Sequence, residues 1–345
     1  MISLALFNNK GGVGKTTLTY HLAHMMQRQG RRVLAVDLDP QSNLTAAFLD
    51  EDALGDLWGE PQTPAWGGPH QSPLWSQIDD RAGTVASAVK PIMDGLGDVR
   101  DVLPVEIRDG LWLVAGDLDL SAFEDRLSDA WPRCFTGDNL AAIRTTTAFY
   151  RIIVEAVRTT EAEIVLIDVG PNLGAINRAA LLAADAVLMP LAADLFSLRG
   201  LMNLGPALRR WRTTWQETVL PHTQAQDIAL PQGAMVPLGY VIMQPTMRLD
   251  RPVRAYQRWL ERIPTVFAKA VLGTSAEGAD KSYEIATLRN YQSLMPLSHD
   301  ARKPMFDLRA ADGALGSTQL LVQRCRADFE ELSRRVLDRL AALPA

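Results

Sequence analysis

The amino-acid sequence predicts an α/β fold: a doubly wound, mostly parallel sheet with helices on both faces. Three observations indicate it: short apolar runs that end at Gly, Pro or Asp, a helical segment between the first two runs, and an ordinary globular composition. Of 345 residues, 47% are hydrophobic and 22% are charged, which excludes a mainly disordered, collagenous or coiled-coil chain. We expect one domain over residues 1–345, with residues 50–150 as a variable insertion within it.

The first elements are a strand, a helix and a second strand. The run from Ile2 to Phe7 predicts a buried strand that ends at a Gly-rich turn. Helical periodicity then extends from Thr16 to Gln29 and stops at Gly30, a residue that suits the position after a helix. Val33 to Val36 predicts the next strand. This order is a βαβ unit, so we expect the two strands to be parallel neighbours.

Later segments continue the alternation. Buried strands are predicted at Ile164–Ile167, Ala186–Met189 and Leu238–Met243. The stretch from Asp50 to Asp80 differs, because it contains seven acidic residues, four prolines and three tryptophans but no Lys or Arg. We expect an irregular surface segment held by its own aromatic side chains, with a partner-binding surface as the alternative.

Charge and cysteine content limit the possible functions. The formal net charge is −5, so any contact with nucleic acid must come from a local basic patch. Cys134 and Cys325 lie far apart without a CxxC motif, which fits a reducing cytoplasm and predicts no zinc or redox centre. The N-terminus does not have the pattern of a targeting segment, and the apolar stretch from Ala179 to Phe196 is interrupted by charged residues and a proline. We therefore expect a cytoplasmic protein.

The segment KGGVGKTT joins the first strand to the first helix. Its three glycines let backbone N–H groups turn towards phosphate oxygens, and the following helix presents its positive N-terminus to the same anion. Lys15 can reach the β- and γ-phosphates, and the Thr16 hydroxyl can bind Mg²⁺. The segment predicts a nucleotide site formed by Lys10, Gly11, Gly12, Val13, Gly14, Lys15, Thr16 and Thr17.

This loop departs from the ordinary G-x-x-x-x-G-K-[ST] pattern, because Asn9 stands at the first glycine position and Lys10 opens the loop. The arrangement resembles the deviant P-loop of the ParA, Soj and MinD ATPases, and most of all the ParA partition branch. The resemblance implies a P-loop NTPase fold and a homodimer that sandwiches two ATP molecules. It also implies that Lys10 contacts phosphates across the dimer interface.

Two carboxylate motifs extend the resemblance. The segment VDLDPQSN, from Val36 to Asn43, is similar to the family's second motif, which implies that Asp39 orients the attacking water and that Asp37 belongs to the Mg²⁺ and switch network. The strand ending at Asp168 matches the family's Walker B-like position, where the carboxylate holds a Mg²⁺-bound water. The cofactors implied are ATP and Mg²⁺, with Lys10, Lys15 and Asp39 as catalytic residues and Thr16, Asp37 and Asp168 as metal residues.

Two further features bear on the switch and the base. The family usually follows the Walker B-like Asp with one hydrophobic or Cys residue and two prolines, whereas this chain has Val169-Gly170-Pro171, and we expect a more mobile second switch. Arg289-Asn290 with Pro296 and Lys303-Pro304 resembles the family segment beside adenine, and Gln244-Pro245 falls where the family often places a residue that touches the base. The nucleotide-binding assignment therefore also includes Gln244, Pro245, Asn290 and Pro296.

Two arginine clusters indicate a DNA-binding surface. Arg248, Arg251, Arg254, Arg258 and Arg262 fall within 15 residues, and from Arg251 onward their spacing predicts one face of a helix. A second group consists of Arg199, Arg209, Arg210 and Arg212. Ordinary solvated helix faces are the alternative for each cluster. ParA-like proteins carry basic residues for nonspecific DNA binding at the position that corresponds to the first cluster. The resemblance therefore implies DNA contacts by Arg199, Arg248, Arg251, Arg254 and Arg258.

The resemblance implies a slow ATPase that acts as a timed switch: ATP favours a dimer bound to nonspecific double-stranded DNA, and hydrolysis releases it. The expected role is plasmid partition, chromosome segregation or cargo positioning, with a ParB-like adaptor as activator and nucleoid association in the ATP state. The loop begins at residue 10, which fits the small type without an N-terminal helix-turn-helix domain.

Two alternatives remain open: a MinD-like membrane-associated ATPase, and a ParA-like ATPase of a regulatory or defence system. The tail from Leu320 to Leu343 is amphipathic with mixed charges, so we expect a packing helix there and no membrane partner. A reductase of the nitrogenase iron-protein type is excluded because the two cysteines do not follow switch-type segments.

Overall fold

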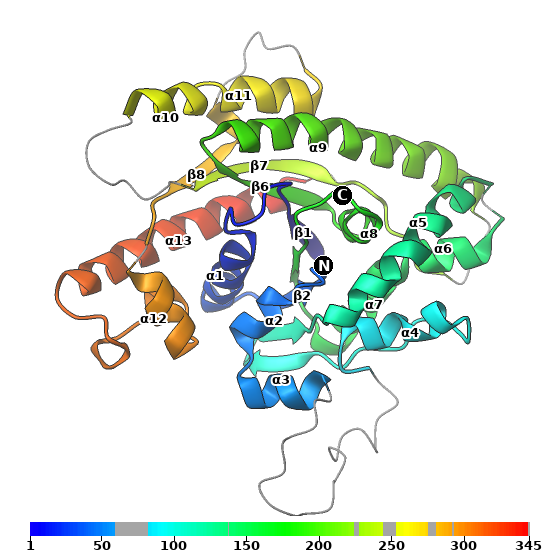
Figure 1. The fold of residues 1–345 in the computed structure, drawn as a ribbon, viewed down its shortest axis with the longest axis horizontal. Coiled ribbons are helices and arrows are strands. Elements are labelled where there is room, and N and C mark those ends of the chain that lie inside the picture. The colour runs from blue at the N-terminus through cyan, green and yellow to red at the C-terminus, as the bar shows by residue number, and fades with distance from the viewer. Residues whose placement is uncertain are drawn as a thin grey trace, which may run out of the picture.

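A computed structural model of the chain describes residues 1–58, 82–136, 138–223, 228–243, 253–274, 281–291 and 293–343. Its centre is an eight-stranded sheet in the order β3-β4-β2-β5-β1-β6-β7-β8 (Figure 1). All neighbouring strands are parallel except the pair β3 and β4. The strands are β1 (Ile2–Leu6), β2 (Val33–Asp37), β3 (Val105–Arg108), β4 (Leu111–Val114), β5 (Ile164–Asp168), β6 (Ala186–Ala192), β7 (Val236–Met243) and β8 (Glu284–Leu288). The predicted α/β fold with a mostly parallel sheet is confirmed.

Helices cover both faces of this sheet (Figure 1). The side chains of β1 alternate between two apolar clusters: Ala5 packs with α4 to α9, and Leu4 and Leu6 pack with α1, α12 and α13. The helices are α1 (Lys15–Arg28), α2 (Asn43–Phe48), α3 (Glu51–Trp58), α4 (Val85–Asp94), α5 (Phe123–Arg133), α6 (Leu140–Thr146), α7 (Ala148–Thr160), α8 (Ala175–Leu182), α9 (Leu195–Thr213), α10 (Val253–Leu260), α11 (Ile263–Val266), α12 (Leu294–Ala301) and α13 (Ser317–Ala341).

The expectation that the first two strands are neighbours is wrong. Strands β1 and β2 are parallel, but β5 lies between them and pairs with both. Every residue of β5 is buried, so this strand gains most by occupying a central position with a layer of helices on each side. Because β5 lies beside β2, Asp168 lies directly opposite Asp37 at the carboxyl edge of the sheet.

The segment between residues 50 and 150 contributes regular structure. Strands β3 and β4 extend the main sheet, and α4 to α7 pack against it. The prediction of irregular structure is wrong for residues 51–58, which form helix α3. The Asp50 carboxylate accepts a hydrogen bond from the Ala53 N–H at the start of α3. The rest of the predicted irregular stretch, residues 59–80, lies outside the described residues.

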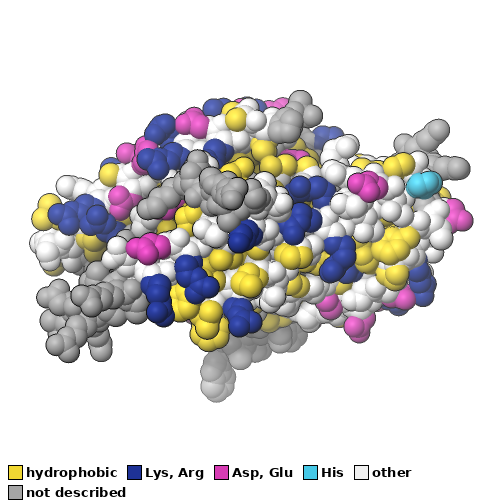
Figure 2. All heavy atoms as spheres, turned by 90° about the horizontal axis from the view of Figure 1, so that it is seen from above, with side chains coloured by type: hydrophobic (Ala, Val, Ile, Leu, Met, Phe, Trp, Pro, Cys, Tyr) yellow, Lys and Arg dark blue, Asp and Glu magenta, His cyan; other side chains and the backbone are white. Residues whose placement is uncertain are grey.

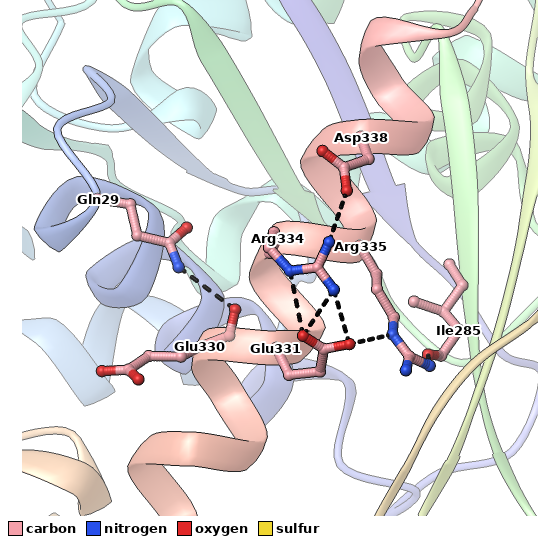
Figure 3. A network of polar contacts seen from close by, with 7 residues as sticks. All are labelled: Gln29, Ile285, Glu330, Glu331, Arg334, Arg335 and Asp338. Atoms are coloured by element: carbon pink, nitrogen blue, oxygen red, sulfur yellow. Dashed lines mark hydrogen bonds and ion pairs between the residues drawn. The ribbon is translucent and has the colours of Figure 1, made fainter.

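Helix α13 confirms the prediction of a packing helix in the C-terminal tail. Its apolar face is buried against the α1 side of the sheet. On its polar face, Glu331 binds Arg334 and Arg335, and Arg335 also donates to the Ile285 carbonyl of β8 (Figure 3). Gln29, just after α1, donates to the Glu330 carbonyl (Figure 3). These contacts fasten α13 to both β8 and α1.

Cys134 and Cys325 are both buried and do not form a disulfide bond. Every helix in the described part of the chain is too short or too polar to span a bilayer.

Candidate nucleotide site

The predicted phosphate loop lies between the carboxyl end of β1 and the start of α1, at the centre of the sheet. Gly12 and Gly14 have φ values of 69° and 91°, a left-handed conformation that a side chain would strain. Gly14 precedes α1, and its lack of a side chain leaves the N–H groups of the first helical turn without a side-chain cap. The loop can therefore direct these N–H groups at a bound anion.

Lys15 is buried in this loop, with 7% of its surface exposed. Burial lowers the pKa of its ammonium group, while the nearby carboxylates of Asp168 and Asp39 oppose the shift. A buried cation of this kind is stabilised by an anion in the same pocket. The polyphosphate group of a nucleotide has the charge and the size to fill that role.

Two buried carboxylates face each other beside the loop. Asp168 accepts hydrogen bonds from the Thr16 hydroxyl at 2.6 Å and from the Thr19 hydroxyl at 3.4 Å. Asp37 accepts from both the backbone N–H and the hydroxyl of Thr45, each at 2.8 Å. Burial raises the pKa of both Asp37 and Asp168, and like charges add to each shift: Asp39 acts on Asp37, and Asp37 acts on Asp168. A cation near the pair would relieve this repulsion.

These groups fit Mg²⁺, which prefers oxygen ligands and usually retains several waters beside one or two carboxylates. The Thr16 hydroxyl and the Asp168 carboxylate form one connected set of oxygen donors. In the described part of the chain, no three His, Cys, Asp or Glu side chains cluster as a self-sufficient metal site. The arrangement therefore fits an ion held jointly by protein oxygens, water and phosphate.

Asp39 follows β2 and is almost fully buried, with its Oδ1 atom accepting the Gln41 N–H at 3.0 Å. It lies close to Gly170, where an added Cβ atom would come within 3.3 Å of both Asp39 Oδ1 and Asn177 Nδ2. Asn177 donates to the Gly170 carbonyl and accepts from the Gly170 N–H. Gly170 is therefore held at both its N–H and its carbonyl, and its small size permits the close approach of Asp39. The greater mobility expected of this switch stays a prediction.

Lys10 lies at the mouth of the loop. Its ammonium nitrogen is 2.5 Å from Asp194 Oδ2, and both side chains are about one third exposed. The other oxygen of Asp194 accepts the Ser197 N–H and so caps α9. Partial burial alone would raise the pKa of Asp194, but the bonds from Lys10 and Ser197 outweigh it and lower that pKa. Sequence analysis missed Asp194, because 184 residues separate it from Lys10.

The loop opens into a cavity of about 810 Å³. The predicted residues Arg289 and Asn290 line this cavity together with Met243, Tyr291 and Met295. Pro296 is exposed on α12 and is not among the lining residues, whereas its neighbour Met295 is. The other two residues assigned to the base, Gln244 and Pro245, lie outside the described residues.

His21 is a second residue that sequence analysis missed. Its Nδ1 atom lies 2.7 Å from the Thr17 carbonyl, and its Nε2 atom accepts the Met305 N–H at 3.0 Å. These partners require a neutral ring with the proton on Nδ1. Burial lowers the pKa of His21 to about 4, which keeps the ring neutral. His21 therefore connects the helix after the phosphate loop to the segment before α13.

The arginines of the second predicted cluster, on α9, are partly exposed and partly bonded within the fold. On α9, Arg199 and Arg210 are exposed, but Arg209 donates to the Ala270 and Val271 carbonyls and Arg212 donates to the Met235 carbonyl. Arg209 and Arg212 therefore have structural roles. The face formed by α9 to α11 presents Lys and Arg among hydrophobic side chains, with acidic side chains mainly towards its edges (Figure 2).

The predicted single helix through Arg262 is wrong. Helix α10 ends at Leu260, and Arg262 is the residue before α11. Pro264, in the first turn of α11, has no N–H to bond the Leu260 carbonyl, so the helix cannot continue. Arg258 is exposed on α10. Arg248, Arg251 and the side chain of Arg254 lie outside the described residues.

Comparisons with known proteins show which family the chain resembles. A family model described as an AAA domain matches residues 1–220. The chain is 32% identical over 228 residues to the chromosome partitioning protein ParA of Caulobacter vibrioides, covering 66% of this chain and 68% of the relative. It is 30% identical over 212 residues to the chromosome-partitioning ATPase Soj of Thermus thermophilus, covering 61% and 62%. A solved structure of protein DIP2308 from Corynebacterium diphtheriae matches with a TM-score of 0.67 and 25% identity, covering 88% of this chain and 97% of that one.

Proposed function

Because the chain belongs to the ParA family of AAA-domain ATPases, we propose that it is an ATP-dependent dimerising switch for the partition or positioning of DNA or another large cargo. In this proposal, ATP closes two subunits around shared nucleotides, the dimer binds double-stranded DNA without sequence preference, and slow hydrolysis releases it. An adaptor protein of the ParB kind would set the timing of hydrolysis. The ATP-bound form would then associate with the nucleoid.

The chemistry assigns a role to each group around the loop. Lys15 and the loop N–H groups would hold the phosphates, and Asp39 would orient the attacking water. Thr16, Asp37 and Asp168 would hold Mg²⁺ with its waters, and the bound ion would supply positive charge to the β- and γ-phosphates. Phosphoryl transfer depends above all on positioning and charge stabilisation, and these residues would supply both. Asn290, Arg289 and Met243 line the cavity in which an adenine ring would lie.

The position of Lys10 is the observation that carries the proposal of a dimer. Its ammonium group sits at the mouth of the cavity, paired with Asp194 and not inserted beside Lys15. The next two residues, Leu195 and Phe196, have exposed fractions of 44% and 71%. A cation and two exposed apolar side chains at the rim of a phosphate pocket suit a second copy of the same chain.

The DNA-binding part of the proposal depends on the α9 to α11 face. Arg199 and Arg258 are exposed there. Dimerisation would double the number of phosphate contacts, and affinity for a duplex rises steeply with that number. A nucleotide-controlled dimer can therefore bind DNA even though one subunit carries a net charge of −5.

One experiment tests both parts. The mass of the full chain in solution and its binding to an arbitrary duplex are measured with a non-hydrolysable ATP analogue, with ADP and without nucleotide. We expect dimers and DNA binding with the ATP analogue alone. Lys10→Ala should remove the dimer but retain nucleotide binding, and Lys15→Ala should remove both.

Lys90→Ala is the matched control, because Lys90 is an exposed lysine on α4 whose ion pair, within the described residues, is the local one with Asp94. It should behave like the unchanged chain. Equal DNA binding in all three nucleotide states, or a monomer that hydrolyses ATP at the same rate after Lys10→Ala, would refute the switch.

A further inference from the structure

A second pocket lies at the opposite end of α1 from the phosphate loop. Lys15 begins α1 and Arg28 ends it, so the two ends are about 20 Å apart for a helix of this length. The pocket has a volume of about 400 Å³. Its lining residues are Arg28, Arg108, Lys303, Asp307, Leu308, Arg309 and Arg326. We call it the basic pocket.

Four elements that are distant in the sequence supply its cations. Arg28 comes from the last turn of α1, Arg108 from the end of β3, and Arg326 from α13. Lys303 and Arg309 come from the segment between α12 and α13. Of these five side chains, only Lys303 belongs to a segment compared above with the one beside adenine, and none of the five lines the cavity at the phosphate loop. The pocket is therefore distinct from the ATP site and from the α9 to α11 face.

Its positive charge is only partly balanced. The Asp307 carboxylate is shared by Arg28, at 2.5 Å, and Arg326, at 3.6 Å. Lys303 pairs with Asp312 at 2.7 Å. Within the described residues, Arg108 and Arg309 form no ion pair. Five cations thus face two carboxylates, an excess of three positive charges on a chain that is acidic as a whole.

The charged groups can be reached by a ligand. The side chains of Arg28 and Arg326 are 38% and 48% exposed, so their pairing with Asp307 is weak and can be exchanged for another anion. Guanidinium groups bind phosphate oxygens through two parallel N–H donors. Several such groups converging on one hollow match an anion that carries more than one phosphate.

We propose that the basic pocket binds a small molecule with two or more phosphate groups, at a site separate from the ATP site. Its volume lies at the small end of the range for ligand pockets, which is roughly 300–1,000 Å³, and exceeds what a single phosphate needs. A DNA duplex is a convex cylinder too wide to enter a hollow of this size. This inference goes beyond the proposed function and does not depend on dimerisation.

Inorganic pyrophosphate is the probe that tests the pocket. Because the phosphate loop would also bind it, calorimetric titrations use the full chain with Lys15→Ala, without Mg²⁺. We expect one pyrophosphate per chain, and a loss of affinity of about tenfold or more when Arg108→Gln and Arg309→Gln are added. These two arginines are chosen because they form no ion pair among the described residues, so their replacement should leave the fold intact.

Arg324→Gln is the matched control, since Arg324 is exposed on α13 but does not line the pocket. It should leave pyrophosphate affinity unchanged, and thermal melting curves should show that all variants are folded. Absence of binding in the Lys15→Ala chain, or equal affinity with and without Arg108 and Arg309, would overturn the proposal. So would a duplex that binds through these arginines while pyrophosphate does not bind.

Discussion

Replacing Asp194 by Asn should strengthen the ATP-dependent dimer. In the structure, Asp194 holds Lys10 within its own subunit, at 2.5 Å. The proposed dimer requires Lys10 to leave this partner and reach phosphates on the other subunit. Asp194→Asn removes the charge that retains Lys10, but the remaining side-chain oxygen can still accept the Ser197 N–H that caps α9.

The size of the effect follows from the exposure of the pair. Both side chains are about one third exposed, so the pair belongs to the class of solvent-accessible ion pairs, which contribute about 0.2–1 kcal/mol each. A symmetric dimer breaks two such pairs, one in each subunit. The dissociation constant of the dimer should therefore fall by about 2- to 30-fold.

Sedimentation equilibrium with a non-hydrolysable ATP analogue measures this constant directly. Raising the salt concentration should reduce the difference between Asp194→Asn and the unchanged chain, because an exposed ion pair is screened. Asp194→Ala serves for comparison, because it also removes the N-cap of α9. This variant should have a free energy of unfolding that is lower by about 1 kcal/mol. A dimer that is weaker or unchanged in Asp194→Asn would refute the view that Asp194 restrains Lys10.

Three further predictions address the site itself. Asp39→Ala should leave ATP-bound dimers that persist, and a variant that stays monomeric with ATP in sizing chromatography would contradict this role. Gly170→Ala should slow ATP hydrolysis, measured as released phosphate, about tenfold with little change in nucleotide affinity. The reason is that the added Cβ atom would come within 3.3 Å of the Asp39 carboxylate, and an unchanged hydrolysis rate would contradict this prediction. Burial lowers the pKa of His21 to about 4. Between pH 6.5 and 4, the unfolded chain therefore binds a proton at this residue that the folded chain does not bind. Because of this proton, the free energy of unfolding should fall by about 2 kcal/mol from pH 7 to 5. Urea unfolding at both pH values tests this prediction. His21→Gln should reduce the pH dependence of the free energy of unfolding, whereas replacement of the exposed His299 by Gln should not.

Several features could be predicted from sequence because they depend on neighbouring residues. The phosphate loop needs glycine backbone freedom and a lysine at a fixed spacing, and the segment from Lys10 to Thr17 contains both. The strands ending at Asp37 and Asp168 are short apolar runs, and burial of such runs makes them strands in almost any α/β context. The apolar periodicity of the tail likewise predicts the packing face of α13.

Other features were decided by tertiary structure alone. The position of β5 between β1 and β2, which sets Asp168 opposite Asp37, depends on the packing of the whole sheet. The pairing of Lys10 with Asp194, the bond from Met305 to His21, and the basic pocket each join segments that are far apart in the chain. Local patterns fix which segments are strands and helices, but strand order and long-range ion pairs follow from the free energy of packing the complete fold.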